Sequence, residues 1–178
     1  MSQTTIHTTK KLEKQVAKLI RKDEPENSSP LGKWNAHLFY ISRKKCWLVT
    51  NKKTQYHLLL TDITAKKLKD IDRIFTDVFY EQLVYDGMVV NHRQLSEWVG
   101  DLAFRPTDND RRMNGFQKQR LFELEWKTID YAHLDDMPIR DFNQKLNQNI
   151  IHLDKDKTRS SDYTRATENM QKLINGLR

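Results

Sequence analysis

The residue types best suited to chemistry are cations beside aromatic rings between residues 34 and 60. The cations fall in two expected turns and the rings flank them: Arg43, Lys44, Lys45, Lys52 and Lys53, with Phe39, Tyr40, Trp47 and Tyr56. Sheets that bind single-stranded nucleic acid combine stacking aromatics with a cationic groove. Aromatic residues on strands are more often core residues, however, and no RNP-like consensus is present. Nucleic-acid contact and a solvated basic surface are therefore both open.

The other reactive residue types form no catalytic or metal-binding pattern. The six histidines include no i, i+4 pair and no H-E-x-x-H motif, although His37 and His57 could face each other across strands. Cys46 is the sole thiol, and we expect it to be buried and inert at the start of an inner strand. There is no G-x-S-x-G or Walker A pattern. We expect no cofactor and no metal, and no residue can be assigned a catalytic role.

Length and composition indicate one domain, or one domain with an appendage. The chain has 178 residues, of which 37% are hydrophobic and 31% charged. A net charge of +7 favours anionic partners such as nucleic acid or an acidic protein. The single cysteine fits a reducing compartment, and the absence of a long apolar segment predicts a cytoplasmic protein that does not enter the membrane. The oligomeric state stays open.

The stretch 34–60 is expected to form a β-meander. Its aromatic and β-branched residues predict three strands joined by short loops, at 35–42, 46–50 and 56–60. Large apolar groups on both sides of the first strand predict a sheet that is covered on both faces over part of its area. Before the meander, the sequence indicates a short β segment, a basic helix and a long loop, at 4–8, 9–22 and 23–33.

The second half of the chain is expected to be rich in helices. They are predicted at 62–87 (capped by Thr64 and ended by Gly87), 91–100, 108–131 and 135–149, with an irregular connection at 101–107. A polar linker follows at 154–162, and residues 163–177 carry the thin apolar stripe of a docking helix. The predicted fold is α+β: a small antiparallel β-meander covered by several helices. It forms one domain over 1–153, followed by a polar linker and helical tail over 154–178.

Several motifs resemble an uncharacterised bacterial domain family of unknown function. The resemblance rests on W-x-A-H-L-F-Y-I-x-R-K-K-C and L-x-T-N-x-x-T, more loosely on residues 107–115 and on Leu146-Asn147, and covers about residues 5–150. Asp110 is an extra residue relative to the family's pattern, and Arg112-Met113 stand where the family has small residues. The resemblance implies no activity. The positions that match its motifs are Trp34, Arg43, Lys45, Asn51, Thr54, Asn109, Arg111 and Gly115.

These positions have the residue types of a polar site between a sheet edge and a helix start. Arg111, near a helix N-terminus, could hold an anion there. With His37 added and Gly115 set aside, they form the predicted binding site. If they surround one pocket, Asn51 and Arg111 should lie within roughly 15 Å of each other, the reach of two side chains and a small ligand.

Two functions fit this set of residues. The first is a basic, non-enzymatic binding module that contacts nucleic acid or an acidic protein. The alternative is an enzyme acting on a phosphorylated or anionic small substrate, through Arg43, Lys45, Arg111 and either His37 or Asp108. A third reading is an assembly protein whose C-terminal helix docks on a partner.

Overall fold

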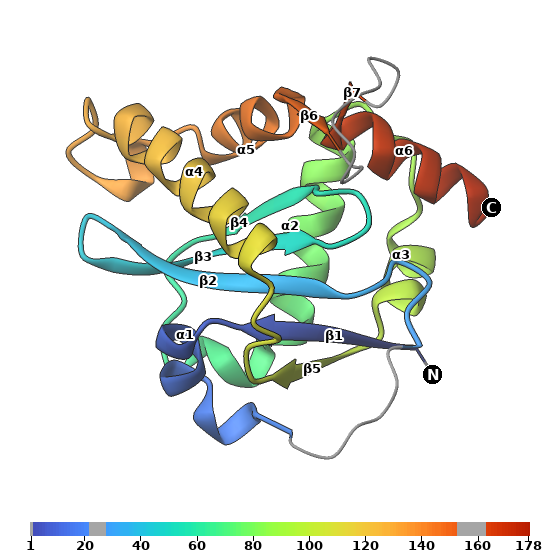
Figure 1. Cartoon of the computed structure of the whole chain (residues 1–178), viewed down its shortest axis with the longest axis horizontal. Helices are drawn as coiled ribbons and strands as arrows, with labels where there is room; N and C mark the ends of the chain where they lie inside the picture. The colour runs from blue at the N-terminus through green and yellow to red at the C-terminus, as the bar shows by residue number, and fades with distance from the viewer. Residues whose placement is uncertain (1, 22–27, 153–162) are drawn as a thin grey trace.

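A five-stranded mixed sheet forms the centre of the protein. The computed structural model describes residues 2–21, 28–152 and 163–178. Its strands are β1 (Gln3–Thr8), β2 (Trp34–Ile41), β3 (Lys44–Asn51), β4 (His57–Leu60) and β5 (Asp101–Arg105). The sheet order is β4-β3-β2-β1-β5 (Figure 1). Strands β2, β3 and β4 pair antiparallel, so the predicted meander is confirmed as one part of a larger sheet.

Strands β1 and β5 complete the sheet with parallel pairs. The predicted β segment at 4–8 is confirmed as β1, which lies between β2 and β5. The predicted irregular connection at 101–107 is wrong, because residues 101–105 form β5. This strand is only five residues long and begins and ends on charged residues, so its sequence lacks the alternation by which longer strands are recognised.

The helices follow the predicted order, with shifted boundaries. They are α1 (Lys10–Gln15), α2 (Ile71–Tyr85), α3 (His92–Val99), α4 (Arg111–Thr128), α5 (Ile139–Gln148) and α6 (Ala166–Gly176). Short 3-10 turns occupy 17–19, 67–70 and 134–136. A small hairpin pairs β6 (Ile150–His152) with β7 (Tyr163–Arg165). Helix α1 is shorter than predicted, since Ile20 already bridges to Phe104 of β5.

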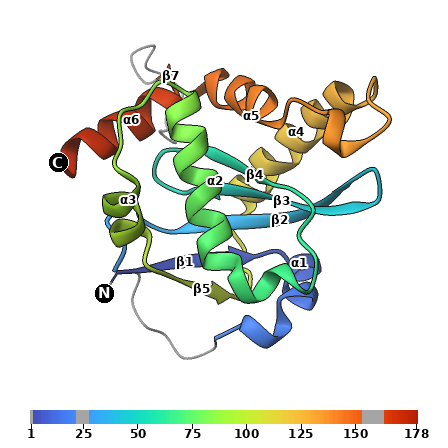
Figure 2. The ribbon, with the colours of Figure 1, turned by 180° about the vertical axis from the view of Figure 1, so that it is seen from behind.

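Helix α2 crosses one face of the sheet (Figure 2). It begins at Ile71 after a 3-10 turn, so the predicted cap at Thr64 is wrong. Its end is as predicted: Gly87 has φ +82, and the Met88 N–H donates to the Leu83 carbonyl at 2.9 Å. This pattern closes the helix by a Schellman motif, in which glycine adopts the left-handed conformation without a steric penalty.

The face under α2 holds the larger hydrophobic core, here called the α2-side core. Trp34 is fully buried there, and its ring meets Phe75 and Phe79 edge-on at 5.3 Å each. Helix α6 contributes to the same core through Ala166, Met170 and Ile174. The predicted linker at 154–162 lies outside the described residues, and the domain boundary at 154 stays a prediction.

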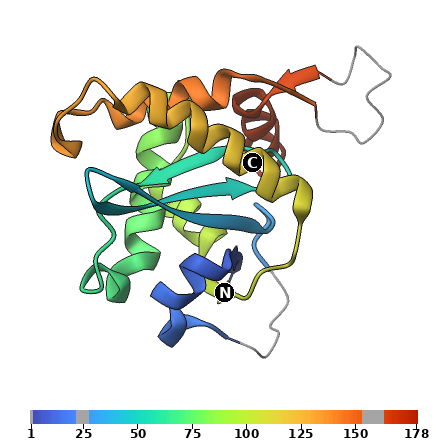
Figure 3. The same ribbon diagram turned by 60° about the vertical axis from the view of Figure 1, so that its left-hand side comes forward.

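Helices α4 and α5 lie over the opposite face (Figure 3). A second, smaller core lies beneath them and includes Cys46, Leu48 and Phe142. Both faces of the sheet are therefore covered, as predicted. The prediction that Cys46 is buried is also confirmed, and burial raises the pKa of its thiol. Among the described helices, none combines the length and apolar character needed to cross a bilayer.

Candidate functional site

A row of polar side chains crosses all five strands on the α4 side of the sheet. Strand register pairs Arg105 of β5 with His7 of β1, and His7 with Asn35 of β2. It then pairs Asn35 with Thr50 of β3, and Thr50 with His57 of β4. Neighbours in register share one face of a sheet, so all five side chains point to the same side. We call these five residues the polar row.

The His57 end of the row is closed by protein. Gln117 of α4 donates to Thr50 Oγ1 at 3.0 Å and to the backbone carbonyls of Asn35 and Leu48. Thr50 Oγ1 lies 2.9 Å from His57 Nδ1. Within the described part of the chain the Thr50 hydroxyl has no other acceptor, so it donates to Nδ1 and the ring hydrogen stays on Nε2. Burial, aided by the charge of Arg120, lowers the pKa of His57 to about 3. His57 is therefore neutral at pH 7.

Several buried atoms near His57 lack a hydrogen-bond partner among the described residues. They are two donors and two acceptors: His57 Nε2, Arg120 Nε, Gln117 Oε1 and Asn143 Oδ1. The His57 ring stacks on the Phe116 ring with centroids 5.1 Å apart. The Arg120 guanidinium lies 4.9 Å from the centroid of the Phe116 ring. Each such group costs about 1–3 kcal/mol when left unpaired. The closed end of the row is thus a polar region within the core and not a solvent-facing site.

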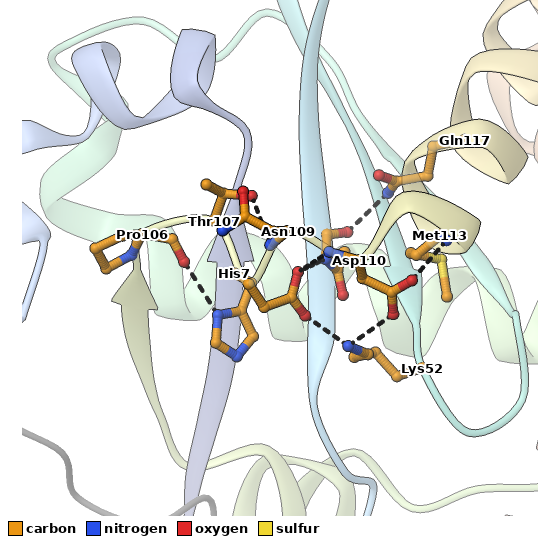
Figure 4. Close-up of polar contacts among 10 residues, drawn as sticks. His7, Lys52, Pro106, Thr107, Asn109, Asp110, Met113 and Gln117 are labelled. Carbon is orange, nitrogen blue, oxygen red and sulfur yellow. Dashed lines mark hydrogen bonds and ion pairs between the residues drawn. The ribbon is translucent and has the colours of Figure 1, made fainter.

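The other part of the row meets a charged cluster at the start of α4 (Figure 4). Lys52 Nζ lies 2.5 Å from Asp108 Oδ2 and 3.0 Å from Asp110 Oδ2. Asn35 Nδ2 donates to Asp108 Oδ1 at 3.1 Å, which joins the cluster to the polar row. Asp110 also caps α4 by accepting the Met113 N–H at 2.9 Å. We call Lys52, Asp108 and Asp110 the Lys52 cluster.

The charges of the Lys52 cluster stabilise one another. Burial opposes ionisation of Asp108 and Asp110, but hydrogen bonds from Lys52 and from backbone N–H groups together outweigh it and lower the pKa of both carboxyls. For Lys52, burial is likewise outweighed by the two carboxylates, which raise the pKa of the ammonium. Lys52 is therefore a permanent cation near pH 7 and does not serve as a base or nucleophile.

His7 presents a lone pair at the open part of the row. Its Nδ1 lies 3.1 Å from the carbonyl oxygen of Pro106 (Figure 4). A carbonyl oxygen only accepts, so Nδ1 carries the ring hydrogen and Nε2 keeps its lone pair. The side chain is half-buried, next to the buried Arg105. This arrangement can accept a hydrogen bond or a proton from a bound molecule.

A groove between α1, β2 and α4 is the second candidate site. Its volume is about 360 Å³, and it is lined by Lys11, residues 37–41 of β2, Leu121, Leu124, Glu125 and Thr128. His37 lines this groove. Burial lowers its pKa most, and the positive charges of Lys118 and Lys11 lower the pKa further. Lys11 Nζ lies 5.7 Å from the centroid of the exposed Tyr40 ring. The groove therefore combines positive charge with an accessible aromatic ring.

The structure places the predicted site residues of the two turns at opposite ends of the β2–β3 hairpin, whereas His37 lies between these ends in β2. Register pairs Ile41 with Lys44 at one end and Trp34 with Asn51 at the other. Strand β3 is eight residues long, so these ends are separated by roughly 23 Å at about 3.3 Å per residue. Arg43 and Lys45 lie at the first end, far from Asn51, and the predicted set does not surround one pocket.

Three of the predicted site residues have structural contacts that account for them. Trp34 belongs to the α2-side core, on the face opposite the polar row. Asn51 Oδ1 accepts from the backbone N–H groups of Lys53 and Thr54 and from Thr54 Oγ1, while Asn51 Nδ2 donates to the Leu31 carbonyl. Asn51 and Thr54 are both buried, so together they build the β3–β4 turn.

Asn109 and Arg111 lie exposed beside the Lys52 cluster. Asn109 has φ +56, and its N–H donates to Thr107 Oγ1 at 3.1 Å. Arg111 is the first residue of α4. The β3–β4 turn and the start of α4 meet, as the enzyme hypothesis requires. The contact between them is made by Lys52 and Asp108 and not by Asn51 and Arg111.

The polar row was not foreseen from the sequence. The sequence does contain a pattern that points to it. In each strand, side chains alternate between the two faces of the sheet, and at least one polar residue falls among those that face α4. Matching these residues across strands needs the sheet order, which includes the unpredicted β5. Gln117 was missed because it is a polar residue on the buried side of a helix.

Comparison with known proteins places the chain in a family. A family model described as "Domain of unknown function (DUF6933)" matches residues 5–168, further than the 5–150 covered by the motifs. No curated protein and no solved structure matches the chain significantly. Among the residues that the structure describes, no three potential metal ligands lie close enough together to hold an ion.

Proposed function

Since this chain belongs to the DUF6933 family, a family of unknown function, we propose its role from its own geometry: a non-enzymatic binding module that contacts nucleic acid. The observation that carries the proposal is the groove between α1, β2 and α4. His37 lines the groove close to the positive charges of Lys11 and Lys118. The exposed ring of Tyr40 lies beside Lys11.

The groove supports this function better than the Lys52 cluster does. In the cluster, one ammonium is neutralised by two carboxylates. Within the described ranges, neither Lys11 nor Lys118 forms an ion pair. Their charges are therefore available to a phosphate backbone, and the net charge of +7 favours approach of a polyanion.

Fluorescence anisotropy with mixed-sequence oligonucleotides tests the proposal. We expect binding at low salt that weakens steeply as salt rises, because neutralising phosphates releases counterions. The double variant Lys11→Glu/Lys118→Glu should bind about ten-fold more weakly or worse. The matched control is the same double charge reversal on exposed lysines far from the groove, Lys69→Glu/Lys172→Glu.

Three results would contradict the proposal: no binding at low salt, a flat salt response, or equal losses in the groove and control variants. The last result would mean that net charge alone, and not the groove, governs association.

An enzyme acting on an anionic small substrate is the second candidate function. His7 favours it, because its Nε2 lone pair lies at the open part of the polar row, between Arg105 and Asn35. In this proposal His7 exchanges a proton with the substrate, while Arg111 at the start of α4 contacts the anionic group. Turnover of a panel of phosphate esters that is lost in His7→Gln would support it. Turnover unaffected by that substitution would exclude His7.

A further inference from the structure

Helix α4 exposes residues of the kind that a helix packed on a sheet normally buries. Its inner side carries the buried polar residues Gln117 and Arg120 beside the buried apolar residues Met113 and Leu124. Its outer side carries Phe122 and Trp126, which are 59% and 64% exposed. Ile129, directly after the last residue of the helix, is 70% exposed. Figure 3 shows α4 along the outside of the molecule. Apolar residues therefore lie on both sides of α4.

The two exposed rings form an ordered pair. Phe122 and Trp126 are one helical turn apart, with centroids at 6.2 Å and an interplanar angle of 79°. Together with Glu123 and Lys127 they line a hollow of about 330 Å³. Contiguous exposed apolar surface of this kind often marks a binding site.

The hollow and the groove proposed above lie on different sides of α4 and share no lining residue. The groove is lined by residues 121, 124, 125 and 128 of α4, and the hollow by residues 122, 123, 126 and 127. A chain lying in the groove thus needs to cross only the outer surface of one helix to reach the rings.

The charges around the rings suit a polyanion. Lys118 lies one turn before Phe122, and Lys127 lines the hollow itself. The acidic group of the hollow, Glu123, is already engaged: it accepts from Arg120 and, at 2.8 Å, from Asn149 Nδ2. Glu125 is the remaining exposed carboxylate of this helical segment.

We infer that Phe122 and Trp126 form a stacking platform for unpaired bases, so that the nucleic acid bound by this protein is single-stranded. The inference rests on the proposed function, because the phosphates of the same strand lie in the groove beside Lys11 and Lys118. Every base offers a ring face to an aromatic side chain, so the contact tolerates any sequence. In a duplex the base faces are already stacked and cannot reach the rings.

The test compares a single-stranded oligonucleotide with a duplex of the same length by anisotropy. Trp126→Leu keeps an apolar side chain but removes the large ring, so single-strand affinity should fall about five-fold or more. Duplex affinity should stay within about two-fold of its original value. The control is Tyr85→Leu, which removes an exposed ring that lies at the end of α2 and lines neither the groove nor the hollow. It should change neither affinity.

A second readout uses fluorescence. Of the four tryptophans, Trp126 is exposed, Trp98 is half-buried, and Trp34 and Trp47 are fully buried. Added single strand should quench the emission of the original protein, and Trp126→Leu should lose most of this quenching. Circular dichroism confirms that the variant is folded.

Three outcomes would overturn the inference while leaving the proposed function in place, the third being self-association through the rings. One is a Lys11→Glu/Lys118→Glu double variant that weakens binding of every oligonucleotide while Trp126→Leu changes nothing. Another is an equal loss of single-strand and duplex affinity in Trp126→Leu. A change of elution volume in gel filtration caused by Trp126→Leu, without a change in affinity, would assign the rings to self-association. If the original protein binds no oligonucleotide, the proposed function fails together with the inference.

Discussion

The two faces of the sheet use their buried side chains differently. The α2 side is sealed by apolar groups, with the Trp34 ring held edge-on between Phe75 and Phe79. The α4 side carries the polar row and buries Gln117, Arg120 and Asn143. Burying polar groups brings little net stability even when they are hydrogen-bonded, and it costs stability when they are not.

This difference separates what folds the protein from what it presents to partners. The apolar face accounts for most of the hydrophobic stabilisation, since it holds the larger core. The α4 side adds less to stability because it buries polar groups. It holds both candidate sites, the groove and the Lys52 cluster. We therefore expect substitutions on the α2 side to change stability most, and substitutions at the surface of the α4 side to change binding.

Truncation of the α2-side core should give the largest loss. Trp34→Ala removes a fully buried ring and its two edge contacts, and should lower the free energy of unfolding by about 3–5 kcal/mol. The same substitution at the exposed Trp126 should change it by no more than about 0.5 kcal/mol. Urea unfolding measures both. Similar losses at the two positions would erase the distinction between the faces.

Gln117→Leu should show a smaller loss on the polar face. The substitution keeps the side-chain size but removes the donor for Thr50 Oγ1 and for two backbone carbonyls, so we expect a loss of about 2 kcal/mol. Gln119→Leu, at an exposed position of the same helix, is the matched control. An unchanged urea midpoint for Gln117→Leu would show that the hydrogen bonds from Gln117 to the polar row do not stabilise the fold.

His57 makes the stability of the polar face dependent on pH. Its folded pKa of about 3 lies below the unfolded value near 6.5, so the unfolded chain binds the proton first as pH falls. The stabilisation is complete above pH 6.5 and should decrease by about 1.4 kcal/mol per pH unit below it. Urea midpoints at several pH values measure this slope, which His57→Gln should flatten. The independent check is the His57 ring signal in NMR, which should not titrate between pH 8 and 5.

Lys52→Met should have the smallest effect on stability. The ammonium and its two carboxylates are partly exposed, with side-chain exposures of 28%, 17% and 28%, so we expect a loss of about 1 kcal/mol. High salt should shrink the loss further. Lys66→Met, at an exposed position, serves as the control. A loss larger than that of Gln117→Leu would make the Lys52 cluster a structural centre of the fold.

The apolar face is the part that the sequence predicts well. Aromatic and β-branched runs located the three meander strands, helical spacing located α2, and Gly87 marked its end. These features depend on local periodicity. Strand β5 was missed because five residues with charged ends carry too little of it.

The candidate site was predicted less well, for two reasons. Within a meander the two turns that flank β3 must lie at opposite ends of that strand, so Arg43 and Asn51 could not share a pocket. That conclusion follows from the predicted strands alone. The contacts of Lys52 with Asp108 and of Gln117 with the polar row depend on how α4 packs on the sheet, which no local pattern specifies.

The most direct test of nucleic-acid binding on the α4 side uses NMR. It observes the tryptophan indole N–H signals while a single-stranded oligonucleotide is added at low salt. The four tryptophans sample both sides of the molecule: Trp34 and Trp47 in the α2-side core, Trp98 on α3, and Trp126 on α4. Binding on the α4 side should move the Trp126 signal while the Trp34 and Trp47 signals stay in place. Movement of Trp98 with an unmoved Trp126, or no movement at all, would contradict the assignment of binding to the α4 side.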